Sequence, residues 1–250
     1  MTKTRIQKVL SEAGLASRRA AEQMILDGRI TVNGVLVTQL PCFVDPAVDD
    51  ISVDGQAVAR RSLERVYVLL NKPRGVVCTQ QDPRGRPRAA DMVPHLRQPV
   101  YCIGRLDDDN TGLIVLTNDG ELTQYLTHPR YGVPKTYVVE VDGRLDSKAI
   151  AGLKGGVYLD GKRTGRASVK VLRSGPARSL LEISLAEGRN REVRQILARL
   201  GHKVRRLKRT AIGPITDRGL KVGHWRPLTA AEVAKLRQCG RPSAGKRKKG

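Results

Sequence analysis

Three consecutive aspartates, residues 107–109, form the densest acidic cluster of a strongly basic chain. Carboxylates at this spacing could hold a divalent cation, act as acid, base or nucleophile, or cap a tight turn. A calcium loop would need a glutamate at its twelfth position, where the chain has Asn118, and a helix where residues 113–116 predict a strand. Calcium is therefore excluded, whereas a magnesium-dependent nuclease built on Asp107 and Asp109 stays an alternative.

Positive charge is the second chemical feature of the chain. With 46 Lys and Arg against 24 Asp and Glu, the 250 residues carry a formal charge of +22, which favours a polyanionic partner over ordinary metabolic chemistry. The charge is densest in residues 188–209, where nine basic side chains accompany one acid. Six Tyr, one Trp and one Phe are too few to stack many bases. Binding should therefore depend on phosphate contacts and weaken steeply with salt.

Other chemistries receive little support from the sequence. Its four cysteines, Cys42, Cys78, Cys102 and Cys239, lie too far apart for a Cys-x-x-Cys metal site, and its four histidines are equally scattered. We therefore expect reduced thiols, no bound metal and no cofactor. Because there is no apolar run of about 18 residues and no apolar signal region, we expect a cytoplasmic protein that does not bind membranes. We also expect a monomer.

The first 55 residues predict a compact module of two helices and a hairpin. Apolar residues at helical spacing in 6–13 predict the first helix, and the second should begin at the N-cap Ser17. The pair Asn33-Gly34 then predicts a type I′ hairpin. Since the inner face of the second helix is apolar, Arg18 and Arg19 should point outward.

The remaining chain predicts a larger, strand-rich α+β domain. Residues 56–65 are expected to form a polar linker, and 66–238 contain many short apolar runs separated by Gly and Pro. We expect helices near 121–127, 191–200 and 230–238, with Asn190 capping the second of these. Residues 239–250 are basic and rich in Gly and Pro. They predict a disordered tail that either adds nonspecific RNA affinity or is a solvated terminus without a role.

Both parts of the chain resemble known families. Residues 13–19 (Ala-Gly-Leu-Ala-Ser-Arg-Arg) followed by Val-Asn-Gly at 32–34 resemble the S4 RNA-binding fold. Further on, the ordered motifs resemble the RsuA/RluB-type ribosomal RNA pseudouridine synthases. These motifs are Asn-Lys-Pro-Arg-Gly at 71–75, the run 104–120 ending in Asn-Asp-Gly, Pro-Lys-Thr-Tyr at 134–137, residues 187–195, Arg-Leu-Lys-Arg at 206–209 and Ile-Gly-Pro at 212–214.

The resemblance implies a fold, a reaction and a set of catalytic residues. It implies a mixed, mainly antiparallel sheet and the isomerisation of uridine to pseudouridine without cofactor or metal. Asp107 matches the catalytic aspartate, which either attacks C1′ or removes a ribose proton, and Arg194 matches the arginine that pairs with it. Tyr137 matches the tyrosine that packs on the target uracil, although a tyrosine of a core strand is the competing interpretation.

The same resemblance and the charge pattern suggest which groups contact RNA. The expected contacts are Arg18, Arg19, Lys72, Arg74, Arg105, Arg189, Asn190, Arg191, Arg205, Arg206, Lys208 and Arg209. Residues 71–75 and 81–87 resemble the large-subunit branch more closely, which favours 23S ribosomal RNA or the assembling large subunit as partner. The alternatives are 16S ribosomal RNA as substrate, or a ribosome-assembly protein that binds RNA without catalysis.

Overall fold

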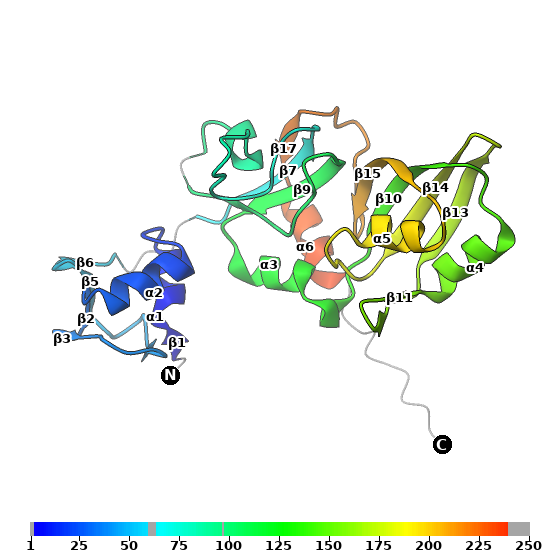
Figure 1. The fold of residues 1–250 in the computed structure, drawn as a ribbon. Coiled ribbons are helices and arrows are strands. Elements are labelled where there is room, and N and C mark those ends of the chain that lie inside the picture. The colour runs from blue at the N-terminus through cyan, green and yellow to red at the C-terminus, as the bar shows by residue number, and fades with distance from the viewer. Residues whose placement is uncertain (1–2, 60–63, 97, 240–250) are drawn as a thin grey trace, which may run out of the picture. The chain divides into compact units, whose positions relative to one another are not determined.

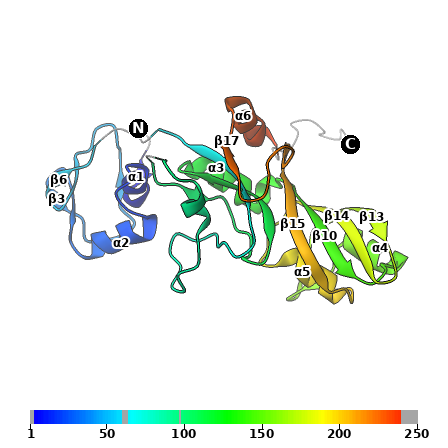
Figure 2. The ribbon, with the colours of Figure 1, turned by 90° about the horizontal axis from the view of Figure 1, so that it is seen from above.

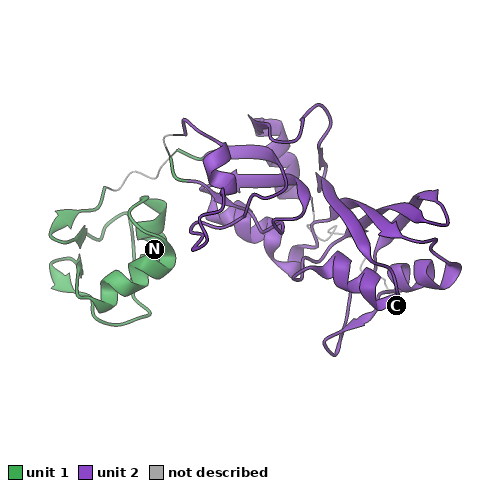
Figure 3. Ribbon diagram, turned by 45° about the horizontal axis from the view of Figure 1, so that its top comes forward, with its two compact units in different colours: residues 1–65, 97–99 green, residues 66–96, 100–250 purple. Residues whose placement is uncertain are grey.

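The computed structural model describes residues 3–59, 64–96 and 98–239. Its contacts divide the chain into two units, residues 1–65 with 97–99 and residues 66–96 with 100–250 (Figure 3). The sheet of the first unit reaches β6 (Gln56–Ala57), so the first two residues of the predicted linker are a paired strand. All of the predicted tail except Cys239 lies outside the described residues.

The first unit is a small α+β module. A sheet in the order β3-β2-β5-β6 is antiparallel throughout, and β1 pairs separately with β4. Buried aliphatic side chains from both helices and from β2, β4 and β5 form its core. The elements are β1 (Thr4–Arg5), α1 (Ile6–Glu12), α2 (Arg18–Leu26), β2 (Ile30–Val32), β3 (Val35–Leu36), β4 (Phe43–Val44) and β5 (Ile51–Val53).

The local signals predicted for this unit are present in the structure. The hydroxyl of Ser17 accepts a backbone hydrogen bond at 3.2 Å and caps α2. Asn33 and Gly34 both have positive φ, as a type I′ turn requires. Arg18 and Arg19 are exposed in the first turn of α2, so their predicted outward orientation is confirmed.

The second unit is built on one mixed sheet in the order β13-β14-β10-β15-β9-β7-β17, with β16 and β8 paired at β15 and β9. Every neighbouring pair is antiparallel except β15 and β9. The predicted mixed, mainly antiparallel sheet is therefore confirmed. The strands are β7 (Tyr67–Lys72), β8 (Tyr101–Cys102), β9 (Thr111–Thr117), β10 (Lys135–Asp142), β13 (Ser168–Ser174), β14 (Arg178–Leu185), β15 (Val204–Ile212), β16 (Ile215–Thr216) and β17 (Trp225–Pro227), with a separate hairpin of β11 (Tyr158–Leu159) and β12 (Lys162–Arg163).

Helices cover the two halves of this sheet separately (Figures 1 and 2). α4 (Ser147–Gly155) and α5 (Glu192–Arg199) share a core with β10, β14 and β15. α3 (Gly120–Thr127) and α6 (Ala230–Gln238) share another with β7 and β9. Three of these helices fall where they were predicted, whereas α4 was not predicted. Among the described residues, no helix is long and apolar enough to cross a membrane.

The parallel pairing of β9 with β15 brings two motifs together. β9 begins immediately after the aspartate cluster, and its Gly112 lies opposite Arg209 of β15. A Cβ at Gly112 would lie 2.2 Å from the carbonyl oxygen of Arg209, and its φ is +114°. Only glycine allows this approach. The turn carrying Asp107 is thereby fixed beside β15.

The end of the same motif has a structural role. Asp119 caps α3 by accepting hydrogen bonds from the backbone of its first turn. Its second oxygen accepts from the hydroxyl of Tyr67 at 2.8 Å and from Arg237 of α6 at 2.6 Å. The run Asn-Asp-Gly at 118–120 thus ties β7, α3 and α6 into one core.

Candidate active site

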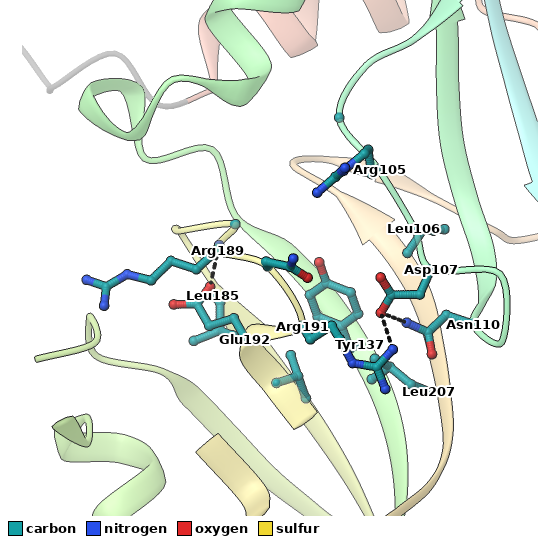
Figure 4. Close-up of a pocket in the computed structure, with 14 residues that line it drawn as sticks. Arg105, Leu106, Asp107, Asn110, Tyr137, Leu185, Arg189, Arg191, Glu192 and Leu207 are labelled. Atoms are coloured by element: carbon teal, nitrogen blue, oxygen red, sulfur yellow. Dashed lines mark hydrogen bonds and ion pairs between the residues drawn. The ribbon is translucent and has the colours of Figure 1, made fainter. Parts of the chain in front are cut away.

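A cavity of about 210 Å³ opens beside the turn that precedes β9. It is lined by residues 104–107 and Asn110, by the loop 188–193, and by side chains from β10, β14 and β15 (Figure 4). Cavities for drug-sized ligands typically measure about 300–1,000 Å³, so this one suits a single ring. Three stretches that are distant in sequence therefore meet at one small cavity.

Asp107 presents its carboxylate to this cavity. Asn110 donates a hydrogen bond from Nδ2 to Asp107 Oδ2 at 3.0 Å, and Arg191 Nη1 lies 3.7 Å from the same oxygen. The other carboxylate oxygen points away from both groups (Figure 4). The side chain of Asp107 is 28% exposed. One oxygen is thus held by the protein while the second is available to a ligand.

Arg194 does not pair with Asp107, so the predicted pairing is wrong. Its Nη2 lies 2.7 Å from Asp109 Oδ2 and 2.6 Å from Asn110 Oδ1, and its Nη1 donates to the carbonyl of Val204 at 3.3 Å. The turn places Asp109 and Asn110, rather than Asp107, within reach of the third residue of α5. The arginine beside Asp107 is Arg191, which had been predicted to contact RNA.

A tight turn orients these neighbours. The N–H of Asn110 donates to the carbonyl of Asp107 at 3.2 Å, and the carbonyl of Asp108 accepts from the N–H of Gly75 at 2.7 Å. The carboxylate of Asp108 pairs with Arg86 at 2.9 Å. The three aspartates therefore have three different partners, which their equal spacing in the sequence did not reveal.

Tyr137 lines the cavity from β10, and its ring lies beside Asp107 (Figure 4). The ring also packs against buried aliphatic side chains of the sheet. Its position near the start of β10 follows from pairing with both β14 and β15. Tyr137 is thus placed to pack against a ring held in the cavity.

A hydrogen bond and an ion pair between its own residues stabilise the loop before α5. Buried Glu192 accepts a hydrogen bond from the N–H of Arg189 at 3.1 Å, and burial above all raises the pKa of Glu192. Arg189 pairs with Glu187 at 3.0 Å and donates to the carbonyls of the β12 hairpin. Its side chain points away from Asp107 (Figure 4). The predicted cap Asn190 is wrong by one residue, because Arg191, with φ +48°, is the N-cap.

Comparison with known proteins identifies the family. A family model described as RNA pseudouridylate synthase matches residues 66–199, and an S4 domain model matches residues 4–40. The chain belongs to the RNA pseudouridylate synthase family. An uncharacterized RNA pseudouridine synthase of Aquifex aeolicus is 42% identical over 94% of each chain. Ribosomal large subunit pseudouridine synthase B of Bacillus subtilis is 43% identical over 93% of this chain and 95% of its own.

A solved structure agrees with this assignment. The crystal structure of a pseudouridylate synthase is 30% identical, covers 93% of this chain and 99% of its own, and has a TM-score of 0.67. The predicted family, fold class and enzyme class are therefore confirmed: the protein is a pseudouridine synthase with an N-terminal S4 domain.

Two predicted RNA contacts of the synthase are wrong because their side chains are buried. Lys72 is 0% exposed, and its Nζ donates to the carbonyls of Pro73 and Val76 at 2.9 and 2.8 Å. Burial lowers the pKa of Lys72. Arg209 is 5% exposed and donates from Nε to the carbonyl of Leu113 at 2.6 Å. Both residues stabilise the chain around the cavity.

The other predicted contacts differ in their surroundings. Arg105, Arg189, Asn190 and Arg191 line the cavity and are exposed. Of those outside it, Arg205 pairs with Asp142 at 2.7 Å, Lys208 pairs with Asp217 at 2.5 Å, and the side chain of Arg206 is 84% exposed. Arg74 is also exposed. Their contact with RNA stays a prediction.

Two further features bear on metal and thiol chemistry. Among the residues that the structure describes, no group of three or more His, Cys, Asp or Glu side chains could hold a metal ion. All four cysteines are free and partly buried.

Sequence reasoning missed Asn110 and Asp109 as partners of Arg194, and no spacing signal distinguishes them from ordinary turn residues.

Proposed function

We propose that this synthase converts uridine to pseudouridine in large-subunit ribosomal RNA, with Asp107 as its catalytic carboxylate. The observation that carries the proposal is the unequal environment of the two oxygens of Asp107. Asn110 holds Oδ2 at 3.0 Å, while the other oxygen faces a cavity of single-ring size. A carboxylate in this arrangement can react with a sugar whose base has left the RNA stack.

The reaction needs a carboxylate and a confined base, and it consumes no co-reactant. The bond between N1 and C1′ breaks, the uracil turns, and C5 bonds to C1′. The proton leaves C5 and N1 gains one, so that the product is an isomer of the substrate. Asp107 acts on C1′ as a nucleophile or on the ribose as a base, and either role needs its ionised form. Arg191 and Asn110 both place N–H donors at Oδ2 of this carboxylate.

The groups around Asp107 have complementary roles in this proposal. The uracil packs on the ring of Tyr137, which keeps the base in place while its glycosidic bond is broken. Arg105 and Arg191 are exposed at the cavity and contact the flanking phosphates. Extruding a base costs a few kcal/mol, which such contacts offset. Arg194 holds Asp109 and Asn110 and does not touch the substrate.

Large-subunit RNA is the proposed target for two reasons. The Bacillus subtilis relative is named as a large-subunit enzyme and matches this chain over 95% of its own length. Residues 81–87, which favoured the large-subunit branch, form a loop whose Arg86 pairs with Asp108 of the catalytic turn. This loop is therefore attached directly to the turn that carries Asp107.

Release of tritium from C5-labelled uridine tests the function directly, because C5 loses its hydrogen in the reaction. We expect purified protein to release tritium from large-subunit transcripts, with a chelator present, and to leave small-subunit transcripts unchanged. Asp107→Asn should abolish release while RNA binding is retained. Asp108→Asn is the matched control, because its carboxylate pairs with Arg86 outside the cavity lining, and it should keep most of the activity.

Each alternative function gives a different result in this assay. Release from small-subunit transcripts alone would reassign the target. Binding without release by the wild-type protein would support an assembly factor, and chelator-sensitive strand cleavage would support a nuclease. Turnover retained by Asp107→Asn would refute the catalytic role of that carboxylate.

A further inference from the structure

Asn110 is a buried amide between two charged groups of the active site. It is 3% exposed. Its Oδ1 accepts a hydrogen bond from Arg194 Nη2 at 2.6 Å, and its Nδ2 donates to Asp107 Oδ2 at 3.0 Å. Asn110 therefore connects α5 to the carboxylate that faces the cavity, although it belongs to the same turn as Asp107.

The charges on either side fix the orientation of this amide. A guanidinium can only donate hydrogen bonds, so the side-chain oxygen of Asn110 must face Arg194. The amide nitrogen, which only donates, must then face Asp107 and requires an acceptor there. If the amide were flipped, its NH2 group would face the N–H donors of Arg194. Its oxygen would then face the carboxylate oxygen of Asp107, so neither hydrogen bond could form. The arrangement therefore selects one orientation of Asn110.

Arg194 is itself fixed, which makes it a firm support for Asn110. Its side chain is 15% exposed, and it contacts Asp109 at 2.7 Å and the carbonyl of Val204 at 3.3 Å. The surrounding helix residues Val193, Ile196 and Leu197 are buried in the core. The guanidinium thus has a defined position set by α5 and β15, not by the RNA.

We propose that Asn110 is a positioning residue that transmits the fixed orientation of Arg194 to Asp107, and that Arg194 acts on catalysis only through Asn110. The inference rests on the proposed function of Asp107. Holding Oδ2 in this way leaves the opposite oxygen directed at the cavity.

Single-turnover tritium release and RNA affinity of the full-length protein test this role. We expect Asn110→Ala to reduce the rate by about 10- to 100-fold, because a hydrogen bond to a charged group is lost, while the Kd for RNA stays unchanged. Asn110→Asp should be slower still, because it keeps the acceptor for Arg194 but places a second carboxylate against Asp107.

Double variants test whether Arg194 affects the rate through Asn110 or independently of it. If Arg194 acts through Asn110, Asn110→Ala with Arg194→Ala should be about as slow as the slower single variant. Arg191 reaches the same oxygen from another position, so Arg191→Ala should add its own effect to that of Asn110→Ala. If the rate reductions of Asn110→Ala and Arg194→Ala multiply in the double variant, Arg194 acts independently of Asn110. That result would overturn the proposal.

A stability control excludes a merely structural effect of the truncation. Asn71 is 1% exposed and donates its side-chain amide to the carbonyl of Leu220 at 2.7 Å, outside the cavity lining. Asn71→Ala should lower the melting temperature as Asn110→Ala does, but keep the wild-type single-turnover rate. A slowed single-turnover rate in Asn71→Ala would count against a specific role for Asn110.

The outcomes distinguish the inference from the proposed function. Active wild type, inactive Asp107→Asn and fully active Asn110→Ala would overturn the positioning role alone. A wild-type protein that releases no tritium, or an active Asp107→Asn, would overturn the proposed function and the inference with it. The expected slow Asn110→Ala with unchanged Kd supports both.

Discussion

At the residue scale, the site depends on side chains whose charges are satisfied in different ways. Asp107 is held on one oxygen by buried Asn110 and lies near Arg191, whose side chain is 48% exposed. The first contact is fixed by packing, whereas the second can change when RNA binds. Lys72 is the opposite case, because it is fully enclosed and makes both of its hydrogen bonds to nearby carbonyls.

Replacing Lys72 should therefore affect folding and not RNA affinity. Lys72→Met leaves the carbonyls of Pro73 and Val76 without their donor, and we expect a loss of about 2 kcal/mol in the free energy of unfolding. The Kd for RNA should not change. Arg74→Gln is the matched comparison, because Arg74 is exposed two residues further on, and it should weaken RNA binding without changing stability. Urea unfolding and filter binding measure the two effects, and weaker RNA binding by Lys72→Met at full stability would contradict this assignment.

These residues also show how far the sequence could specify the site. Motif spacing identified Asp107 and Tyr137, and both line one cavity. Spacing did not reveal that Arg194 would reach Asp109, because a partner one or two positions along a turn depends on turn geometry. Charge counting likewise could not separate buried Lys72 and Arg209 from exposed arginines, because burial depends on which face of a strand points inward.

At the element scale, the contact between β9 and β15 positions the catalytic turn. Two of the matched motifs lie on these strands, and they meet at the only parallel pair in the described part of the sheet. Parallel neighbours cannot be joined by a short turn. The long connection between the two strands contains β10, β14 and α5, which supply Tyr137 and Arg194. One pairing therefore brings the whole active site together.

Gly112→Ala should disrupt this pairing and the activity with it. A Cβ at this position would lie 2.2 Å from the carbonyl oxygen of Arg209, in a backbone conformation that alanine adopts poorly. We expect a loss of more than about 3 kcal/mol in stability or a displaced turn, and at least a 100-fold loss of turnover. Gly143→Ala is the control, since Gly143 also has positive φ but open space around it, and it should cost about 1 kcal/mol. Melting temperatures and tritium release measure both variants, and a stable, active Gly112→Ala would contradict the argument.

Element prediction succeeded where local signals were strong and failed where they were not. The cap at Ser17, the Asn33-Gly34 hairpin and the helix with buried Val193, Ile196 and Leu197 all have clear patterns. α4 was missed although Asp146 caps it by accepting from the backbone at 2.6 Å, because its small and polar residues give a weak apolar stripe. The pairing order of the sheet depends on contacts between distant segments, which single-sequence patterns do not contain.

At the scale of the whole molecule, the positive charge is unevenly distributed between the two units. Residues 1–65 with 97–99 contain ten basic and eight acidic side chains, a net charge of +2, so the other residues carry +20 of the total. The S4 domain should therefore bind RNA through a few placed arginines, such as Arg18 and Arg19, rather than through its overall field. The synthase domain, by contrast, should provide most of the nonspecific, salt-sensitive affinity.

The salt dependence of RNA binding can separate these two contributions. If Arg18 and Arg19 each neutralise one phosphate, the variant with both changed to Gln should reduce the slope of log K against log salt by between about 1.4 and 1.8. Turnover at saturating RNA should be unchanged, because neither residue belongs to the cavity. The comparison variant changes Lys148 and Lys154, two exposed lysines of α4 outside the cavity lining, to Gln. Its slope shows the effect of removing two positive charges from the synthase domain. An unchanged slope in the Arg18 and Arg19 variant would mean that these arginines do not contact phosphate, and that the S4 domain recognises RNA through other groups or not at all.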